Sequence, residues 1–359
     1  MKDLKKGTAK GSVTGLSFRN YHEDRQAKNS VEKVIDLPRG GKLPIVGFGT
    51  WSAFASFSDE EVETAVNAAL EAGYRLIDCA RAYFNEKAIG NVLKKWIDSG
   101  KITRDELFIV SKLPPTGNRP SGVEKHLNQT LNDLQLDYLD LYLIHVPWTF
   151  EEVGDELIPF NEDGEVKLDM STDNEATWKE MEKQVNAGKV RAIGLSNFNI
   201  QQIERINNIS EISVSVIQME MHVYCQQREL LDFCKLNGIA VMANSPLGSP
   251  GLAKFTGKPE ANFYPLKNPT VQTIAQKHEK TPAQVLLRFL IQKGVSVIPK
   301  SSKPHRIQEN FKVLDWTLDS SDMTALESLD KGPEGRVVDF VSFFKGVEKH
   351  PEFPFKTKN

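Results

Sequence analysis

Eight short apolar runs, each followed by a longer amphipathic segment, constrain the fold more than any other feature of this sequence. Because the runs are apolar almost throughout, they predict parallel strands whose outer face is covered by helices. The predicted strands are Ile45–Thr50, Tyr74–Cys79, Leu107–Leu113, Leu139–Val146, Val190–Ser196, Val214–His222, Ile239–Asn244 and Val295–Pro299. Helical spacing of apolar residues predicts helices over Asp59–Ala72, Gly122–Leu136, Ala176–Ala187, Ile200–Ile206, Gln227–Leu236, Asn268–His278 and Pro282–Gln292.

A closed barrel explains this alternation better than a doubly wound open sheet. A nucleotide-binding open sheet needs G-x-G-x-x-G after its first strand, whereas Gly47–Ser52 lacks the third glycine. The span Val34–Leu329 has the size of a barrel. Residues 34–45 form two short apolar runs around a glycine turn, which indicates a hairpin. We therefore predict an α/β fold, a (β/α)8 TIM barrel with an N-terminal β-hairpin and a C-terminal substrate loop.

The domain organisation follows from the two ends of the chain. Residues 1–33 are predicted to be a flexible arm, since Met1–Ser30 holds seven Lys or Arg, three Asp or Glu and no apolar run typical of a secretory signal. Residues 34–359 are assigned to the barrel, including a Phe-rich loop at 331–359 expected to pack over the molecule. The segment Glu151–Glu175, with ten acidic residues and one Lys, is interpreted as a solvated flap.

Composition excludes several classes of function. A formal net charge of −3 does not indicate a nucleic-acid partner, which would require a basic surface. No apolar run reaches the ~18 residues of a membrane span. Three Cys without C-x-x-C form no disulfide framework, and the seven His show no metal-ligand spacing. We expect a cytoplasmic monomer without a metal.

Four titratable residues fall at the carboxyl ends of successive predicted strands, where barrels place their chemistry. Asp78 ends the second strand, Tyr83 follows it, Lys112 ends the third and His145 ends the fourth. The period of two along a strand puts each strand-end residue on the same face as apolar residues of its own strand. The matching residues are Leu76 with Asp78, then Phe108 and Val110 with Lys112, and Leu139, Leu141 and Leu143 with His145.

This cluster suits proton transfer to a carbonyl oxygen. Taken alone, each residue has an ordinary structural interpretation: a helix or turn cap, a solvated charge or a packing residue. The functional interpretation rests on the placement of all four residues at successive strand ends. A buried Lys112 ammonium is expected to lower the pKa of Tyr83 from ~10 towards ~7, a difference of about 4 kcal/mol. Asp78 pairs with Lys112, His145 orients the carbonyl, and Tyr83 acts as general acid while hydride reaches the carbon.

Two loops near the end of the barrel suit a phosphorylated cofactor. Ser245–Gly251 is rich in small residues, and Lys300–Arg306 opens a helix with Pro304 in its first turn. A basic surface turn is the structural alternative for the second loop. Together they suit a dinucleotide with a pyrophosphate and a 2′-phosphate, which favours NADPH over NADH.

Three segments of the chain resemble the signatures of the aldo-keto reductase family, and the similarity runs from about Val34 to Phe355. The segments are Gly73–Glu86, Leu134–His145 and Ile298–Asn310. The resemblance implies NADPH-dependent reduction of an aldehyde or ketone, with the family's catalytic tetrad at Asp78, Tyr83, Lys112 and His145. An alternative within the family is a regulatory NADPH-binding barrel with little turnover.

The resemblance also assigns binding residues. It implies cofactor contacts at Thr50, Trp51, Ser196, Asn197, Gln218, Asn244, Leu247, Ser249, Lys300, Ser301, Ser302, Arg306, Glu309 and Asn310. It implies substrate contacts at Trp51, Tyr83, His145, Val146 and Trp148.

The chain departs from the family pattern at three positions. Asn244 stands where members often stack a Tyr on the nicotinamide, Val146 where a Trp often follows the catalytic His, and Leu113–Pro115 where another Trp is common. Losing both Trp side chains predicts a roomier substrate site. The Leu-Pro-Pro run and the His-Pro-Glu-Phe-Pro-Phe tail resemble insect members, some of which reduce ecdysteroid ketones.

Overall fold

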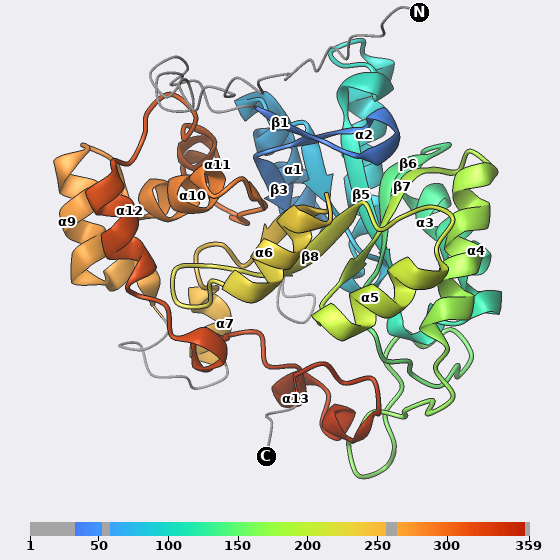
Figure 1. Ribbon diagram of the computed structural model, residues 1–359. Coiled ribbons are helices and arrows are strands. Elements are labelled where there is room, and N and C mark those ends of the chain that lie inside the picture. The colour runs from blue at the N-terminus through green and yellow to red at the C-terminus, as the bar shows by residue number, and fades with distance from the viewer. Residues whose placement is uncertain (1–32, 52–57, 256–263, 356–359) are drawn as a thin grey trace, which may run out of the picture.

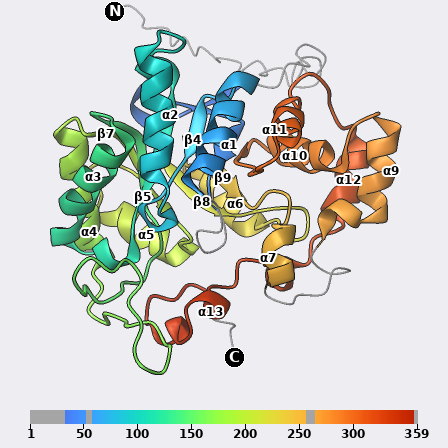
Figure 2. The same ribbon diagram turned by 180° about the vertical axis from the view of Figure 1, so that it is seen from behind.

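Eight parallel strands form a barrel surrounded by helices in the computed structural model, which describes residues 33–51, 58–255 and 264–355 (Figures 1 and 2). Each strand pairs in parallel with the next along the chain, and a parallel bridge between Val46 and Val297 joins the first strand to the last. The strands are β3 (Gly47–Gly49), β4 (Leu76–Asp78), β5 (Phe108–Leu113), β6 (Leu139–Ile144), β7 (Val190–Ser196), β8 (Val216–Glu220), β9 (Ala240–Asn244) and β10 (Ser296–Val297). All eight lie within the predicted ranges, so the predicted barrel is confirmed.

The helices form the outer layer. They are α1 (Asp59–Ala72), α2 (Glu86–Asp98), α3 (Pro120–Leu134), α4 (Asn174–Asn186), α5 (Ile200–Ile209), α6 (Arg228–Leu236), α7 (Pro250–Phe255), α9 (Pro269–Lys277), α10 (Pro282–Gln292), α11 (Pro304–Phe311), α12 (Ser320–Glu327) and α13 (Phe340–Phe343). Helix α1 has the predicted bounds because Ser58 and Glu61 form a capping box and Gly73, at φ 106°, ends it. Helices α2, α7, α12 and α13 are not among the predicted segments.

The barrel interior is a separate apolar core. Leu76 of β4 and Leu141 and Leu143 of β6 pack in it, as the period of two predicts, whereas Leu139 packs with the outer layer. The hairpin of β1 (Val34–Asp36) and β2 (Lys42–Pro44), also confirmed, adds Leu37 and Leu43 to the inner core and so closes the amino end. A cavity of about 840 Å³ lies beside this hairpin. The cavity is therefore at the end opposite to the carboxyl ends of the strands.

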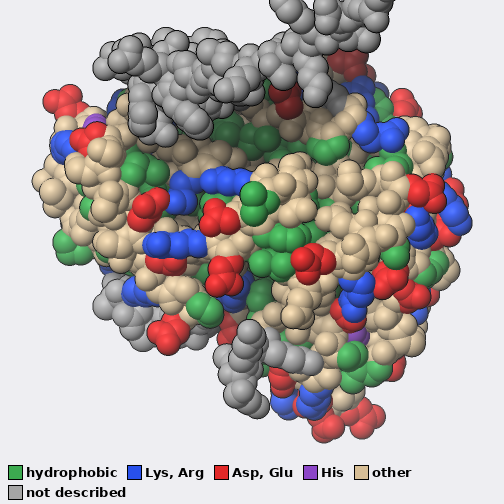
Figure 3. Space-filling model, viewed as in Figure 1, with side chains coloured by type: hydrophobic (Ala, Val, Ile, Leu, Met, Phe, Trp, Pro, Cys, Tyr) green, Lys and Arg blue, Asp and Glu red, His purple; other side chains and the backbone are tan. Residues whose placement is uncertain are grey.

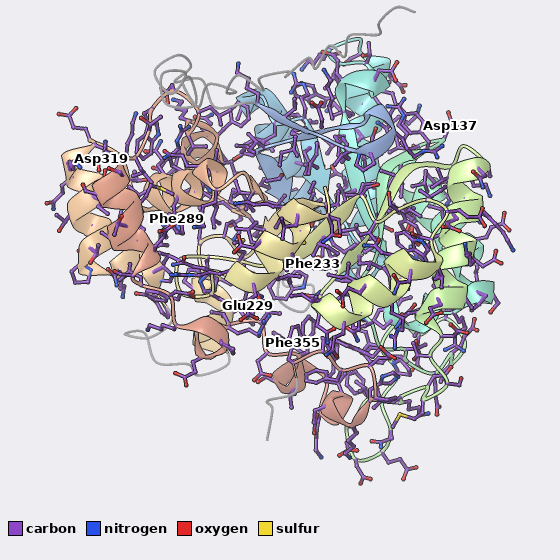
Figure 4. The ribbon with its side chains drawn as sticks, in the orientation of Figure 1. Asp137, Glu229, Phe233, Phe289, Asp319 and Phe355 are labelled. Atoms are coloured by element: carbon purple, nitrogen blue, oxygen red, sulfur yellow. The ribbon has the colours of Figure 1, made fainter. Side chains whose placement is uncertain are left out.

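The flap and the C-terminal loop pack against each other below the barrel in Figure 1. The Trp148 ring contacts those of Phe340 and Phe353, with ring centroids 4.9 and 5.6 Å away, and Figure 4 shows Phe355 beside α13. Glu165 of the flap accepts a hydrogen bond from Lys349 at 2.7 Å. The flap is thus tied to the tail, while most of its residues are exposed as the solvated flap of the prediction requires.

The surface mixes charges of both signs. Figure 3 shows acidic and basic side chains interspersed over the part of this face that described residues form. Within the described ranges, no helix combines the length and the apolar character needed to span a membrane. No group of acidic, His and Cys side chains in those ranges could hold a metal ion.

Candidate active site

The ammonium group of Lys112 is the centre of the candidate active site. Lys112 lies on β5 and has no exposed surface. Its Nζ donates hydrogen bonds to Oδ1 and Oδ2 of Asp78 at 2.9 and 2.8 Å and to the backbone oxygen of Cys79 at 2.8 Å. The Oη of Tyr83 is 3.1 Å from the same nitrogen. The structure thus brings together three of the four predicted catalytic residues around one buried charge.

Short-range geometry sets the position of the phenol. Tyr83 ends the 3₁₀ turn Arg81–Tyr83, and the next residue, Phe84, turns the chain away with φ 59°. Asn85 then donates to the backbone oxygen of Thr50 at 2.9 Å, which ties this loop to the loop after β3. Arg81 forms ion pairs with Asp133 and, at 3.9 Å, with Glu86. The turn that presents Tyr83 is therefore held from both sides.

His145 directly follows β6 and faces the phenol. Its ring stands edge-on to the Tyr83 ring, with centroids 5.6 Å apart and planes at 76°. Its Nδ1 is buried and has no hydrogen-bond partner among the described residues. Burial, and secondarily the charge of Lys112, holds the pKa of His145 well below its usual range. His145 is therefore neutral at physiological pH, with one ring nitrogen able to donate.

The protonation of Tyr83 differs from the expectation. Burial raises the pKa of its phenol to about 12, because it disfavours the phenolate more than the charge of Lys112 favours it. The predicted fall towards 7 is wrong in direction. Burial by itself lowers the pKa of Lys112, but the charges and hydrogen bonds of Asp78 and Tyr83 together outweigh it, and the net direction is upward. At neutral pH Lys112 is therefore a charged ammonium and Tyr83 a neutral phenol.

Polar residues of β7 and β8 join the cluster directly. Gln218 donates from Nε2 to Oδ1 of Asp78 at 2.7 Å. Asn197, whose φ is 63°, donates from Nδ2 to the backbone oxygen of His145 at 3.0 Å and to Oγ of Ser196 at 3.1 Å. These three predicted cofactor residues are nearly or fully buried beside the catalytic candidates. Their amide and hydroxyl groups suit a carboxamide such as that of nicotinamide.

The predicted phosphate-binding residues lie on two loops at the same end. After β9 the chain turns sharply, with positive φ at Ser245, Gly248 and Ser249. Asn244, Leu247 and Ser249 are all partly exposed there. Thr50, after β3, uses its Oγ1 to bond the backbone oxygen of Asp78 at 2.8 Å.

The start of α11 is basic and open. The side chains of Lys300, Lys303 and Arg306 are exposed around its first turn, while Ser301 and Ser302 are partly exposed. A helix N-terminus with exposed cations suits an anionic phosphate. Glu309 accepts from Thr281 at 2.8 Å and Asn310 is buried. Together with the buried amides of Asn197 and Gln218, these groups fit NADP(H).

Of the predicted substrate residues, two are covered by the tail. Trp51 is partly exposed and meets the Phe343 ring edge-on at 6.3 Å. Val146 and Trp148 are buried in one cluster with the tail residues Phe340 and Phe344. The tail therefore supplies aromatic surface next to Val146, and the roomier site stays a prediction.

Sequence reasoning missed Glu220 and Asn85 as parts of this region. Glu220, at the end of β8, is almost fully buried and touches the tail. Its signal was the alternation Val216, Gln218, Glu220, which puts all three on one face of the strand. Asn85 gave no comparable signal because its partner is a backbone oxygen 35 residues away.

Comparison with known proteins agrees with this geometry. The sequence model of the Aldo/keto reductase family matches residues 45–331. The chain is 43% identical to aldo-keto reductase family 1 member A1 of Bos taurus over 325 residues, 89% of this chain and 97% of that protein. The corresponding Mus musculus protein is also 43% identical, over 324 residues and the same shares.

A solved structure agrees as well. The aldose reductase from Schistosoma japonicum superposes with a TM-score of 0.81 at 38% identity, covering 91% of this chain and 100% of that one. Nothing in these similarities supports the alternative of a regulatory barrel with little turnover. The family generally uses NADP(H). This chain therefore belongs to the aldo/keto reductase family and is an NADP-dependent oxidoreductase that acts on carbonyl groups.

Proposed function

We propose that this protein reduces an aldehyde or ketone to an alcohol with NADPH, and that Tyr83 is the general acid. The observation that supports this most is the fully buried Lys112 ammonium, within 3.1 Å of both Asp78 oxygens and of the Tyr83 hydroxyl. A charge buried so completely needs partners, and here one partner is a phenol beside an unpaired imidazole nitrogen.

Hydrogen-bond donors and acceptors decide which way the phenol proton points. An ammonium has three N–H donors and no acceptor, so Lys112 donates to Oη of Tyr83 and cannot accept from it. The O–H of Tyr83 is then left to donate elsewhere. Because the pKa of Tyr83 is about 12, this proton is present at neutral pH. Tyr83 can therefore give it to a substrate oxygen, and Lys112 stabilises the phenolate that results.

The remaining residues orient the reactants. Neutral His145 donates one ring N–H to the carbonyl oxygen, which also receives the Tyr83 proton. Ser196, Asn197 and Gln218 would hold the nicotinamide carboxamide, and Lys300, Ser301, Ser302 and Arg306 the 2′-phosphate. Leu247 and Ser249 would contact the pyrophosphate. Glu309, Asn310, Thr50 and Trp51 complete the proposed cofactor contacts, and the bound cofactor supplies the hydride.

The substrate is proposed to be an apolar carbonyl compound. Trp51 and the Phe343 ring of the tail lie edge to face near the carboxyl ends of the strands, and Trp51, Val146 and Trp148 are the proposed contacts beside Tyr83 and His145. Bulky hydrophobic ketones, ecdysteroids among them, suit such aromatic surface. A monomeric state and a cytoplasmic location stay predictions.

A turnover screen tests the proposed function. NADPH oxidation is followed at fixed enzyme with small aldehydes, aldose sugars and steroid ketones, and repeated with NADH. We expect turnover with NADPH, weaker turnover with NADH, and lower KM for apolar ketones than for sugars. Tight NADPH binding without turnover of any carbonyl would contradict the proposal.

The pH dependence of the two directions should differ. Reduction needs the protonated phenol, so with a Tyr83 pKa of about 12 its kcat should not fall through this group between about pH 6 and 10. Alcohol oxidation needs the phenolate, so its kcat should rise about tenfold per pH unit over the same range. Measuring both profiles with one alcohol–ketone pair checks this. A kcat for reduction that falls as the pH rises through about 7 would contradict this prediction and would support a Tyr83 pKa near 7.

Asn244 makes a separate prediction about cofactor affinity. The side chain is partly exposed at the end of β9, where members of the family often present a Tyr to the nicotinamide ring. Asn244→Tyr should lower the Kd for NADPH about tenfold, since base–aromatic stacking contributes about 1–3 kcal/mol. Fluorescence titration measures this, with Asn244→Leu as a control for added apolar bulk. Unchanged or weaker binding of the Tyr variant contradicts the prediction.

A further inference from the structure

A buried carboxylate at the end of β8 holds the C-terminal tail. Only 1% of Glu220 is exposed. Its Oε1 accepts hydrogen bonds from the backbone N–H of Val337 at 2.6 Å and from Nε2 of His222 at 2.9 Å. Its Oε2 accepts from the backbone N–H of Val338 at 2.8 Å. Two successive backbone amides of the tail, more than 100 residues away in sequence, thus donate hydrogen bonds to the Glu220 carboxylate.

His222 completes this arrangement in a defined tautomer. The backbone N–H of Tyr224 donates to Nδ1 of His222 at 3.3 Å, so Nδ1 is an acceptor and Nε2 carries the proton given to Glu220. Burial alone would raise the pKa of Glu220, but the hydrogen bond from His222, the charge of Arg336 and the hydrogen bond from the Val337 backbone outweigh it and lower the pKa. The carboxylate therefore stays ionised, and charged acceptors form the stronger hydrogen bonds.

A second contact fixes the same stretch of tail. A Cβ on Gly335 would stand only 1.9 Å from the backbone oxygen of Tyr224, so no larger residue fits there without moving the tail. The backbone N–H of Lys331 donates to that same oxygen at 2.9 Å. Residues 331–338 are therefore held against the loop that follows β8.

The segment held in this way reaches both proposed binding regions. Val337 is fully buried in a cluster with Leu252 of α7, and Trp51, Val338 and Phe343 pack against this cluster. Leu252 lies three residues after Ser249 of the proposed pyrophosphate loop, and its N–H bonds the Ser249 oxygen at 2.9 Å. Positioning Val337 thus positions the apolar surface that borders Trp51.

Glu220 is also next to the catalytic cluster along its own strand. Val216 packs in the barrel interior, Gln218 contacts Asp78, and Glu220 follows two residues later on the same face, roughly 7 Å further along. In the sheet, Glu220 is paired with Asn244 of β9. Along one face of β8, successive side chains therefore contact the barrel core, then the Asp78 carboxylate, then the tail.

We propose that Glu220 and His222 are positioning residues that hold the C-terminal tail against Trp51, and that they set the affinity for the carbonyl substrate without transferring a proton or hydride. This inference deepens the proposed function and rests on it for its kinetic readout. It assigns substrate recognition in part to a carboxylate that is almost completely buried.

The test compares Glu220→Gln with a matched control, Glu182→Gln. Glu182 is also buried and also accepts two successive backbone amides, from Glu211 at 2.6 Å and Ile212 at 2.9 Å, but it ties α4 to the loop before β8. An amide offers one acceptor oxygen instead of two. Glu220→Gln therefore leaves a backbone N–H facing an NH₂ group, because Val337 and Val338 donate to different oxygens. In Glu182→Gln one oxygen can still accept both backbone amides, and the NH₂ group instead faces the Lys179 ammonium that donates to Oε2 of Glu182 at 3.0 Å. Both variants should lower Tm. Only Glu220→Gln should raise KM for a bulky ketone, by about tenfold, with kcat nearly unchanged.

Two further measurements separate this inference from the proposed function. Hydrogen exchange of residues 331–350 in the free protein should accelerate in Glu220→Gln and not in Glu182→Gln, whatever the substrate is. Gly335→Ala, which leaves the carboxylate intact but displaces the tail, should reproduce the rise in KM. Equal exchange and equal KM in the two Gln variants would overturn the proposal. Absent carbonyl turnover by the unmodified enzyme would instead refute the proposed function.

Discussion

Tyr83→Phe is expected to lower kcat for carbonyl reduction by about 10²–10⁴-fold while NADPH binds with unchanged affinity. The substitution removes only the hydroxyl, so the ring keeps its edge-on contact with His145. It also removes one of the four acceptors around Nζ of Lys112, and the three remaining, on Asp78 and Cys79, match the three N–H groups of the ammonium. The fold should therefore tolerate the change.

A matched Tyr→Phe control is available on the same barrel. The Tyr138 hydroxyl donates to Asp105 at 3.1 Å on an exposed part of the surface. Tyr138→Phe should leave kcat within about twofold, since it touches no group of the proposed site. Steady-state kinetics and NADPH titration of both variants decide the matter. Retained turnover in Tyr83→Phe would remove Tyr83 from its proposed role.

Lys112→Met is expected to have the largest effect on stability, about 3–5 kcal/mol, together with loss of turnover. It leaves the Asp78 carboxylate buried with the Gln218 amide as its remaining side-chain donor. Removing one partner of a buried pair is costly because the other charge has been taken out of water. Urea unfolding monitored by circular dichroism gives the change in free energy.

Two further variants test whether burial of the charge, and not pairing alone, is responsible for the loss of stability. Lys277 is itself exposed and pairs with Asp319, which Figure 4 shows at the outer edge of the helical layer. It also pairs with Asp322, which is buried but keeps donors from His278 and the Asp319 backbone when the ammonium is removed. Lys277→Met should therefore change stability far less. The double variant Lys112→Met with Asp78→Asn should recover much of the stability but none of the turnover. Recovery of turnover would show that the ammonium is dispensable for proton transfer.

The barrel and the proposed catalytic cluster could be predicted from the sequence because both depend on short-range patterns of residues. A period of two along each strand and the rule that chemistry lies at strand ends were enough to place Asp78, Lys112 and His145 at one end of the barrel. Helix α2 escaped prediction although its buried residues Ile89, Val92, Leu93 and Trp96 have helical spacing.

What only the tertiary structure decided depends on burial by distant parts of the chain. The pKa of Tyr83 rises rather than falls because surrounding protein removes the phenol from water, and no local pattern reports how much water is lost. Glu220 holds Val337 and Val338 across more than 100 residues, so its partners exist only after the chain has closed on itself. The sequence by itself determined which side chains meet at the end of the barrel. Their protonation, and the tail that borders them, were decided by the folded environment, because desolvation and long-range hydrogen bonds are properties of the packed chain.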